Sequence, residues 1–386
     1  MTIVSRIYLP EPSAASFALD AIARRLTAAG HEVDVVTTQW PKATGAPIDS
    51  MNVYRFPVLR DSRGYVRGYL PYLSFDVPLF FRLLLRRRAD VYLVEPPPTT
   101  GAVTRIVTAI LRRPYIYDAA DIWSDAAAMA TRSSFVLRLL RKVELFAVAG
   151  ATGAVTISQG VVDRFRELGS RTPFTVVGFG ADTTVFGYAE ATGAHDSPYF
   201  VYAGSYSEWH GADIFIDAFA IFLPQHPEYR LLFIGNGSER ARLTARAAEL
   251  APDRVEFRDP VSAAHLAPIL HDAVASLASL HPDADYDYAF TSKVYSSLAS
   301  GCPTVFAGPG PTGPFLIAAG QSHRAGAVAD YNPEAVARAL ESMAENPLTP
   351  PQRSSLAAWT AEHHSLDTMA DRVVSVVENS RGSAPR

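Results

Sequence analysis

Short runs of β-branched and aromatic residues alternate with amphipathic stretches along nearly the whole chain, and this alternation restricts the fold more than any other feature. Strands that alternate with helices form parallel sheets, because two parallel strands need a long crossover connection. A helix is expected over Ser13–Ala29, with Ser13 as its N-cap and Gly30 as its C-terminal stop. The expected strands of the first half are Thr2–Tyr8, Val33–Thr38, Asn52–Phe56, Asp90–Val94, Tyr115–Tyr117 and Ala154–Thr156.

The same rhythm starts again in the second half. Its expected strands are Tyr199–Ala203, Arg230–Ile234, Arg254–Phe257, Val274–Leu277, Thr304–Phe306 and Gly326–Ala329. Its expected helices are Asp213–Leu223, Ser238–Leu250, Ala263–His271, Ser292–Ser300 and Pro333–Met343. A chain of 386 residues exceeds what one core usually supports, so we expect two Rossmann-like α/β domains.

The segment Thr183–Pro198 loses the pattern and is placed at the interdomain connection. The expected domains are residues 1–185 and 186–365, followed by a C-terminal helix and tail over 366–386 that packs back on the first domain. Ligands of such sheets bind at the carboxyl ends of the strands, and here two such edges can face each other across a cleft.

Composition excludes several classes of protein. A net charge of -4 argues against general nucleic-acid binding, which requires a basic excess. The single Cys302 rules out an intrachain disulfide and fits a reducing, cytoplasmic compartment. The N-terminus has no signal-peptide pattern, and the apolar stretch from Leu145 to Val162 is interrupted by three glycines, so no membrane span is expected.

The stretch TSKVYSSLASGCP, residues 291–303, places a lone lysine where a short helix begins. Thr291 or Ser292 can cap this helix, whose N-terminus carries a partial positive charge. Lys293 adds a full charge at the same end, which is unfavourable unless an anion binds. Two interpretations stay open here: a solvated surface lysine, or a cation that stabilises a phosphate-bearing leaving group.

Two glycine-containing loops follow neighbouring strands of the second half. Gly204-Ser205 follows the first strand, and Gly235-Asn236-Gly237-Ser238 follows the second and opens a helix. Glycines let a backbone approach a ligand closely, and free N–H groups at a helix start favour an anion. Such turns also occur simply because a strand must join a helix.

A set of collinear segments resembles family 4 of the retaining glycosyltransferases, which have the GT-B architecture. The similarity is strongest to the bacterial branch of N-acetylfucosaminyltransferase-like enzymes. The segments that carry it are LPEPSAASF, LTAAGHEVDVVTT, YDAADIW, FGADTTVF, YAGSYSEWHG, LLFIGNGSERARL, VEFRDPV and SKVYSSLASGCP.

The resemblance implies a nucleotide-diphosphate sugar donor that is held mainly by the C-terminal domain, with no metal or other cofactor. Lys293 would reach the diphosphate or the sugar as a catalytic residue, while Arg258 with Asp259 would lie beside the base. The other donor-binding candidates are Gly204, Ser205, Asn236, Asp287, Tyr288, Phe290, Thr291, Ser292, Tyr295 and Ser296.

The chain departs from the family pattern at its pair of glutamates, spaced E-x7-E. Tyr288 and Ser296 stand at these positions, and Ser205 and His210 stand where the family often has Arg and Lys. Part of the cationic site is therefore missing, which gives Lys293 and Arg258 more weight. An unusual donor sugar and a reduced activity both remain open.

Small and acidic residues define the expected acceptor side in the first domain. Ser13 and Ala14 replace the family's glycine pair and leave room near a ligand. Asp118 and Asp121 follow a strand, and one of them can orient an acceptor hydroxyl, with Asp121 taken as the catalytic candidate. The alternative is that Asp121 caps the next helix.

Two further motifs could be a metal site and a membrane contact, but each also has a simpler structural interpretation. Asp283, Asp285 and Asp287 alternate, but a calcium loop would need Gly and Glu at positions occupied by Tyr288 and Val294, so a solvated loop is favoured. The stretch Phe80–Arg88 is apolar with a basic end. It is expected to be a crossover helix, and contact with an anionic membrane at the inner face remains open.

The sequence thus predicts a retaining, metal-independent glycosyltransferase that moves a sugar to a hydroxyl of a glycan, lipid-linked or natural-product acceptor. The alternatives are a non-catalytic nucleotide-sugar-binding protein, suggested by the missing glutamates, and a nucleotide-sugar epimerase of GT-B fold. Base, sugar, acceptor and oligomeric state stay open.

Overall fold

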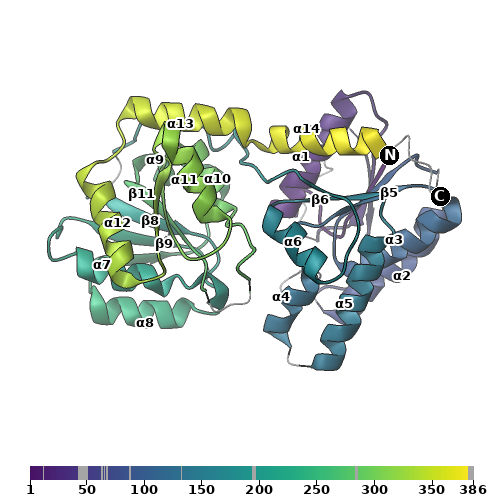
Figure 1. Ribbon diagram of the computed structural model, residues 1–386, viewed down its shortest axis with the longest axis horizontal. Helices are drawn as coiled ribbons and strands as arrows, with labels where there is room; N and C mark the ends of the chain where they lie inside the picture. Colours follow the sequence, from purple (N-terminus) through teal and green to yellow (C-terminus); the bar gives the residue numbers. More distant parts are fainter. Residues whose placement is uncertain are drawn as a thin grey trace. The chain divides into compact units, whose positions relative to one another are not determined.

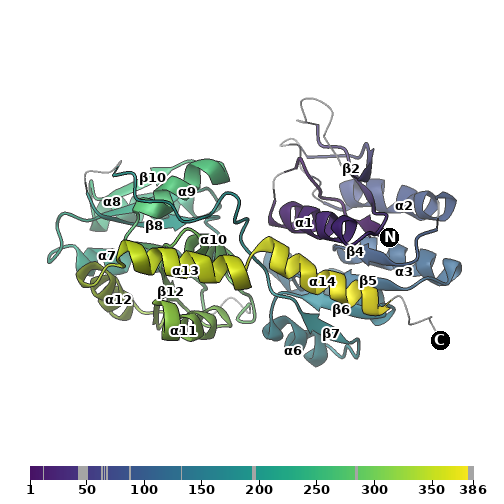
Figure 2. The same ribbon diagram turned by 90° about the horizontal axis from the view of Figure 1, so that it is seen from above.

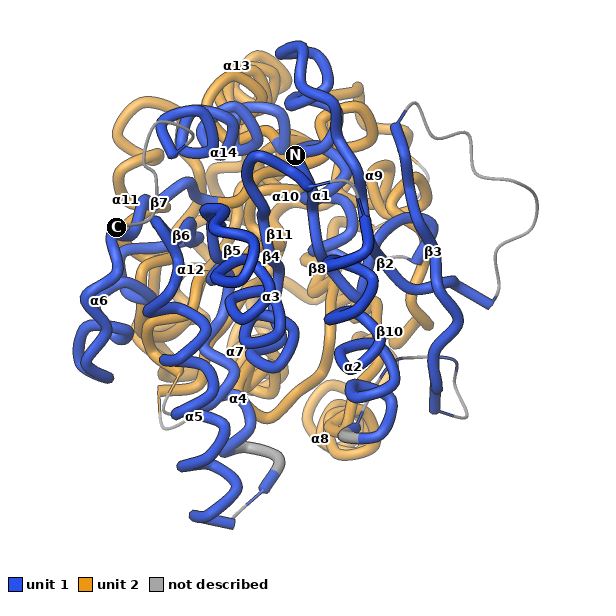
Figure 3. Tube along the Cα trace, turned by 90° about the vertical axis from the view of Figure 1, so that its right-hand side faces the viewer, with its two compact units in different colours: residues 1–178, 366–386 blue, residues 179–365 orange. Residues whose placement is uncertain are grey.

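A computed structural model describes residues 1–11, 13–41, 51–61, 64, 66, 68–86, 88–131, 133–193, 197–282 and 286–380 (Figure 1). The chain divides into two compact units, coloured separately in Figure 3. Unit 1 comprises residues 1–178 and 366–386, and unit 2 comprises residues 179–365. Each unit contains one parallel sheet with helices on both faces, so the predicted α/β architecture of two Rossmann-like domains is confirmed.

Unit 1 is built on a seven-stranded sheet of order β3-β2-β1-β4-β5-β6-β7. The strands are β1 (Thr2–Val4), β2 (Asp34–Thr38), β3 (Asn52–Phe56), β4 (Tyr92–Val94), β5 (Tyr115–Asp118), β6 (Gly153–Thr156) and β7 (Phe174–Val176). The helices are α1 (Ala14–Ala28), α2 (Tyr69–Leu85), α3 (Pro98–Leu111), α4 (Trp123–Ala130), α5 (Ser134–Ala149), α6 (Gln159–Glu167) and α14 (Leu366–Ser380).

The helices of unit 1 form two layers. Helices α1 and α14 pack on one another over one face of the sheet, while α2, α3 and α5 lie side by side over the other (Figures 1 and 2). Arg25 of α1 holds Asp371 of α14 in a two-pronged ion pair, with nitrogen–oxygen distances of 2.6 and 2.7 Å. The end of the chain therefore belongs to the unit in which the chain begins.

Unit 2 has a six-stranded sheet of order β10-β9-β8-β11-β12-β13. The strands are β8 (Tyr199–Ala203), β9 (Arg230–Ile234), β10 (Val255–Arg258), β11 (Ala275–Ser279), β12 (Thr304–Ala307) and β13 (Gly326–Ala329). The α-helices are α7 (Asp213–Phe222), α8 (Arg240–Leu250), α9 (Ala263–Asp272), α10 (Lys293–Ala299), α11 (Thr312–His323), α12 (Pro333–Glu345) and α13 (Pro350–His363), and a 3-10 turn η1 covers Glu208–His210.

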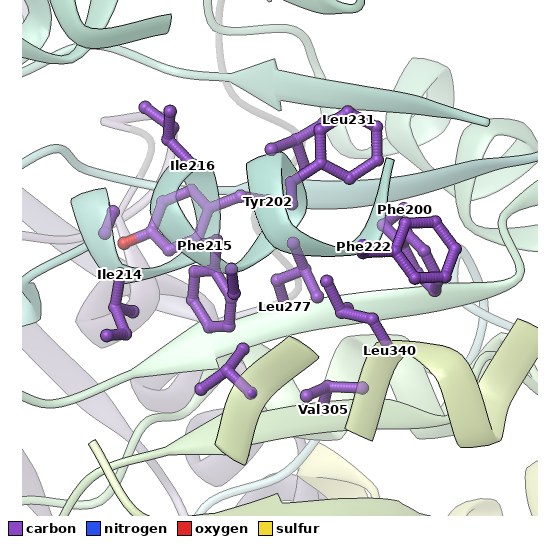
Figure 4. Close-up of a cluster of buried hydrophobic side chains, with 14 of the residues drawn as sticks. Phe200, Tyr202, Ile214, Phe215, Ile216, Phe222, Leu231, Leu277, Val305 and Leu340 are labelled. Carbon is purple, nitrogen blue, oxygen red and sulfur yellow. The ribbon is translucent and has the colours of Figure 1, made fainter. Parts of the chain in front are cut away.

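The core of unit 2 has one apolar layer on each side of the sheet. Figure 4 shows the first layer, in which Tyr202 of β8, Phe215 of α7 and Leu340 of α12 pack together. The second layer places Tyr295 of α10 and Leu270 of α9 against the opposite face. Alternate residues of one strand feed these two layers, as the two-residue period of a strand requires. Both faces of β8 are therefore buried.

The domain boundary lies earlier than expected. The sequence placed it after residue 185, but the division falls between Gly178 and Phe179. The cause is apolar packing: Ala181 and Phe186 are buried in the second core layer of unit 2, with Phe179 and Val185 against it. Residues that looked like a connection therefore belong to the fold of unit 2.

The strand order of each sheet reverses once. In unit 1 the reversal lies between β1 and β4, and in unit 2 between β8 and β11. In open α/β sheets the crevice for a ligand forms outside the carboxyl ends of the strands at this point. The loops after β1, β4, β8 and β11 are therefore the places to look for a site.

Of the expected crossover helix over Phe80–Arg88, Phe80–Leu85 form the end of α2, and the basic end follows the helix from its C-cap Arg86. Helix α2 connects β3 to β4 and buries Phe75, Leu79 and Leu83. Arg87 of that stretch lies outside the described residues. Within the part of the chain that the structure describes, every helix is too short or too polar to cross a bilayer.

Candidate active site

The side chain of Lys293 lies at the strand reversal of unit 2. Lys293 opens α10, and its Nζ lies 3.7 Å from the ring centroid of Tyr202 on β8. The residue is half-buried, but Nζ itself is inaccessible to water and has no hydrogen-bond partner among the described residues. A buried ammonium without a partner is costly, so this position is suited to a group that arrives with negative charge.

Burial lowers the pKa of Lys293 to about 7. Desolvation disfavours the charged form, and among the residues that the structure describes no carboxylate offsets that cost at this amine. Contact with the Tyr202 ring face supplies a weaker, quadrupolar attraction. The amine is therefore poised to take up a proton when an anion binds beside it.

The loop after β8 is shaped by close packing against this lysine and against the loop after β9. Gly204 has φ +149°, and a Cβ there would lie 2.8 Å from Lys293 Nζ. A Cβ at Gly235 would lie 1.9 Å from the carbonyl oxygen of Gly204, and one at Gly237 would lie 2.1 Å from that of Tyr206. Gly235 and Gly237 are thus required by backbone-to-backbone contact, and Gly204 by its φ and by the lysine side chain, whether or not a ligand is present.

His210 stands close to Lys293 but supplies no positive charge near neutral pH. Burial, and then the nearby charge of Lys293, lower the pKa of His210 to about 3. Its Nδ1 lies 2.5 Å from Ser207 Oγ and 3.5 Å from Ser205 Oγ. The ring is therefore held as a neutral imidazole that can exchange hydrogen bonds with a ligand.

The start of α10 is not capped by the side chain of Ser292, contrary to one of the two expected caps. The N–H of Thr291 instead donates to Thr312 Oγ1 at 2.9 Å, which ties this turn to α11. Ser296 follows Lys293 by three residues, so both lie on the same face of the helix. Ser296 is half-buried.

The remaining donor-side candidates divide into edge and core positions. Asn236 is exposed after β9, where its Oδ1 accepts from the N–H of Gly237 at 2.8 Å. Arg258, at the end of β10, donates to Glu256 at 2.6 Å, while Asp259 pairs with Arg240 at 2.7 Å. Asn236, Arg258 and Asp259 therefore all lie at the carboxyl edge of the sheet.

Aromatic packing decides the position of the others. Asp287 is exposed, and Tyr288 packs beside Tyr286 with ring centroids 4.9 Å apart. Phe290 stacks on Tyr295 at 4.8 Å, and Tyr295 is only 4% exposed. Tyr295, expected as a substrate contact, is thus part of the second core layer because its ring fills the space between α10, α11 and His364. Asp283 and Asp285 lie outside the described residues.

A second group of polar side chains lies at the strand reversal of unit 1. Ser5 follows β1 and donates to Oε2 of Glu95, which follows β4, at 2.8 Å. Burial, together with the charge of Asp118, raises the pKa of Glu95 to about 8. Asp118 ends β5, and burial and the nearby Asp121 raise its pKa to about 7. Near neutral pH these carboxyl groups are therefore partly protonated and can both donate and accept hydrogen bonds.

Arg6 lies near the carboxyl group of Glu95 and is only 4% exposed. Its guanidinium lies 3.7 Å from the ring centroid of Tyr72 and 5.9 Å from that of Trp123. Nε and Nη1 are buried without a hydrogen-bond partner among the described residues. The balancing charge comes from Asp76, whose carboxylate accepts from Thr99 and Thr100 at 2.6 Å each.

Asp121 is exposed just before α4, but it is not the N-cap of that helix. The position belongs to Ile122, and the buried Glu144 of α5 accepts from the N–H groups of Trp123 and Ser124 at 2.7 and 3.1 Å. The capping alternative for Asp121 is therefore wrong, because another carboxylate already occupies that place.

Ser13 is the N-cap of α1, as expected, and forms a capping box with Ser16. The Ser13 hydroxyl accepts a hydrogen bond from the N–H of Ser16 at 3.0 Å, so this side chain stabilises the start of α1 whether or not it also contacts a ligand. Ala14 is the first residue of α1 and is exposed.

Sequence reasoning missed Tyr202, Glu95, Ser5 and Arg6, and it noted His210 only as a replaced cation. Tyr202 reads as one more aromatic residue of a buried strand. Glu95 did carry a signal, since an acid directly after the apolar run Val91–Val94 stands at the carboxyl end of a strand. Among the described residues, no three His, Cys, Asp or Glu side chains are grouped so as to hold a metal ion.

Each unit matches a family of glycosyltransferase domains. Residues 15–180 match the family described as "Glycosyl transferase 4-like domain", and residues 197–346 match "Glycosyl transferases group 1". The fold and these two matches define the class: the chain is a glycosyltransferase of GT-B fold. Among curated proteins, no sequence matches the chain.

Solved structures share the fold at low identity. The sucrose-phosphate synthase of Thermosynechococcus elongatus superposes with a TM-score of 0.74 at 16% identity, covering 98% of both chains. HepE of Anabaena in complex with UDP and glucose gives 0.72 at 16% identity, again over 98% of both chains. WaaG, a glycosyltransferase involved in lipopolysaccharide biosynthesis, gives 0.68 at 16% identity over 97% of this chain and 99% of that one.

Proposed function

We propose that the protein transfers a sugar, with retention of configuration, from a nucleotide-diphosphate donor to an acceptor hydroxyl. Unit 2 binds the donor and unit 1 binds the acceptor. The observation that carries the proposal is the buried, unpartnered Nζ of Lys293 at the strand reversal of unit 2. Solved relatives of this fold were captured with UDP, which supports a nucleotide-diphosphate ligand for this chain as well.

On the donor side, the bond that breaks joins the sugar's anomeric carbon to a phosphate oxygen, and negative charge collects on the departing diphosphate. Lys293 becomes fully protonated beside that charge and stabilises it, in a place from which water is excluded. His210 offers a neutral ring to the same phosphates, and Ser296 offers its hydroxyl to the ribose. Arg258 and Asn236 lie at the sheet edge available to the base.

On the acceptor side, Glu95, Asp118 and Asp121 hold and orient the attacking hydroxyl. Glu95 and Asp118, whose pKa values lie near neutrality, can accept a hydrogen bond from that hydroxyl without a fixed charge repelling the diphosphate. The leaving phosphate oxygen takes the proton, so the reaction stays on one face of the sugar. The charge is supplied by Lys293, and the proposed mechanism uses no metal ion.

The finer assignment follows the sequence resemblance. We place the protein in the N-acetylfucosaminyltransferase-like branch on the segments YDAADIW and SKVYSSLASGCP. The buried single Cys302 is consistent with a protein that works in a reducing compartment.

A donor screen tests the proposal. The full chain is incubated with uridine-, guanosine- and thymidine-diphosphate sugars and a panel of hydroxyl acceptors, and the anomeric configuration of any product is read by NMR. Retained configuration with release of the nucleoside diphosphate is the expected result. Inverted configuration would overturn the retaining assignment. Tight nucleotide binding without product would point to a binding protein, and donor conversion without an acceptor would point to an epimerase.

A further inference from the structure

The outward face of α2 in unit 1 is apolar where a surface helix is normally polar. Its most exposed large side chains are Leu70, Leu73, Val77, Phe81 and Leu85, which are between 48% and 86% exposed. Their spacing of three and four residues puts them in one stripe along the helix. The opposite stripe is also apolar and is buried in unit 1, so α2 has two hydrophobic faces and only one is covered.

The two neighbouring helices extend this stripe into a broader surface. Helix α3 packs between α2 and α5, and the three lie side by side over one face of the sheet (Figure 1). Ile106 and Ile110 of α3 are exposed, as are Phe135, Leu139 and Phe146 of α5. We call the exposed side chains of these helices the α2–α3–α5 face. It holds ten of the eighteen exposed large apolar side chains among the described residues, so the exposure is concentrated rather than scattered.

The exposed charged side chains within the three helices are basic, as are two exposed residues that follow α2 and α3. Arg138 and Lys142 of α5 are exposed, as are Arg88 and Arg112, which follow α2 and α3. The acids within the three helices are Asp76 and Glu144, and both are buried and engaged in hydrogen bonds inside unit 1. Asp90, exposed beyond the end of α2, pairs with Arg113 at 3.4 Å. The face is therefore positive although the whole chain carries a net charge of -4.

We propose that the α2–α3–α5 face docks on an anionic lipid bilayer. Apolar side chains of an interfacial helix enter the boundary between headgroups and acyl chains, while arginine and lysine keep their charges at anionic headgroups. Both requirements are met on this face. A second copy of the chain would fit less well, because two such faces would bring like charges together. The inference is independent of the transfer reaction and applies equally to a protein that only binds nucleotide sugars.

Vesicle flotation with the full chain tests the proposal. The vesicles contain phosphatidylcholine with or without phosphatidylglycerol, and the protein fraction that floats is measured at low and high salt. We expect binding to the phosphatidylglycerol vesicles that weakens with salt, and much weaker binding to phosphatidylcholine alone. Absence of binding to the anionic vesicles would overturn the proposal.

Three variants locate the surface. Phe81→Glu with Leu85→Glu removes apolar contact, and Arg138→Glu with Lys142→Glu reverses charge; each pair is expected to lower the bound fraction about tenfold or more. Ile221→Glu with Ile317→Glu, at exposed apolar positions of unit 2, is the matched control and should bind like the wild type. Every changed side chain is exposed, and thermal melting confirms that each variant is folded.

Two results of this series would contradict the proposal. One is undiminished flotation of the Phe81→Glu, Leu85→Glu variant. The other is a dimer in sedimentation equilibrium that the same variant dissociates, with no vesicle binding by the wild type, which would make the face a protein interface. Nucleotide binding measured in parallel separates failure of this proposal from failure of the proposed function.

Discussion

The Nζ of Lys293 on α10 lies 3.7 Å from the ring centroid of Tyr202 on β8, two residues that are far apart in sequence and meet at the strand reversal of unit 2. The amine gains an aromatic face but no hydrogen bond, and burial lowers its pKa to about 7. The ligand-free protein therefore holds a cation in an unfavourable place. A diphosphate that binds beside Lys293 offsets the cost of burying its ammonium group. The first three predictions rest on this stabilisation.

Replacing Lys293 by Ala should weaken binding of a nucleoside diphosphate and lower turnover by about 10²-fold or more, the usual loss when one transition-state donor is removed. Calorimetry measures the first effect and initial rates measure the second. Lys142→Ala is a matched control, because Lys142 is an exposed lysine of α5 in unit 1. Unchanged turnover in the Lys293 variant would remove this residue from the mechanism.

Affinity for the nucleoside diphosphate should fall as pH rises above 7. Below its free pKa of about 7 Lys293 is already charged, and above it binding must take up a proton, which costs up to about tenfold in affinity per pH unit. Calorimetry between pH 6 and 9 measures this slope. Lys293→Met reports the titration of the ligand alone and should give a flatter curve.

A direct reading of the amine is also practical. The chain contains three lysines, Lys42, Lys142 and Lys293, so labelled lysine side chains give few NMR signals. One signal should titrate near pH 7 and move to a higher pKa when the diphosphate is added. Three signals that all titrate near the ordinary value of 10.5 would contradict the burial argument.

Gly204→Ala should disturb the position of the Lys293 amine while leaving the lysine itself in place. A Cβ at φ +149° would lie 2.8 Å from Nζ, so either the loop or the lysine must move. We expect weaker diphosphate binding together with an altered pKa of Lys293. Gly169→Ala is the control for backbone strain, since Gly169 has φ +93° but no atom within 4 Å of its would-be Cβ. Equal binding losses in both variants would show that strain alone is responsible.

Glu95→Gln should flatten the pH dependence of stability in unit 1. The pKa of Glu95 is raised from 4.5 to about 8, so the folded state binds more protons than the unfolded state between these values. Its contribution to stability is fully present below pH 4.5 and is lost as pH rises through 8, by at most about 1.4 kcal/mol per pH unit. Glutamine cannot ionise, so urea unfolding between pH 5 and 8 should show a smaller loss in the variant. Parallel curves for the two proteins would contradict this assignment.

The alternation of strand-like and helix-like segments was enough to predict the fold class and most of the strands and helices. The strands Tyr199–Ala203, Arg230–Ile234 and Gly326–Ala329 have the expected bounds, because proline, glycine or charged residues flank each apolar run. The first strand was overextended to Tyr8: it ends at Val4, where Ser5 turns its hydroxyl to Glu95. The edge strand β7 was missed, although Phe174, Thr175 and Val176 are typical strand residues, because it is only three residues long.

A site residue could be predicted from the sequence only where its residue type is unfavourable in the local structure that surrounds it. Lys293 met that test, since a cation at the start of a helix has a local cost. Ser5 and Glu95 did not, because they are 90 residues apart and become neighbours only through the pairing of β1 with β4. Arg6 looks like an ordinary surface arginine until the rings of Tyr72 and Trp123 cover it.

The return of α14 to unit 1 has a consequence for how the protein is made. Unit 2 is an insertion within unit 1, and the apolar side of α14, including Met369, Val373 and Val377, is buried there. Residues 1–178 leave the ribosome before unit 2, so unit 1 stays incomplete until α14 has been synthesised. A premature stop near residue 365 would leave unit 2 whole, but it would remove from unit 1 the apolar side chains that α14 contributes to its core.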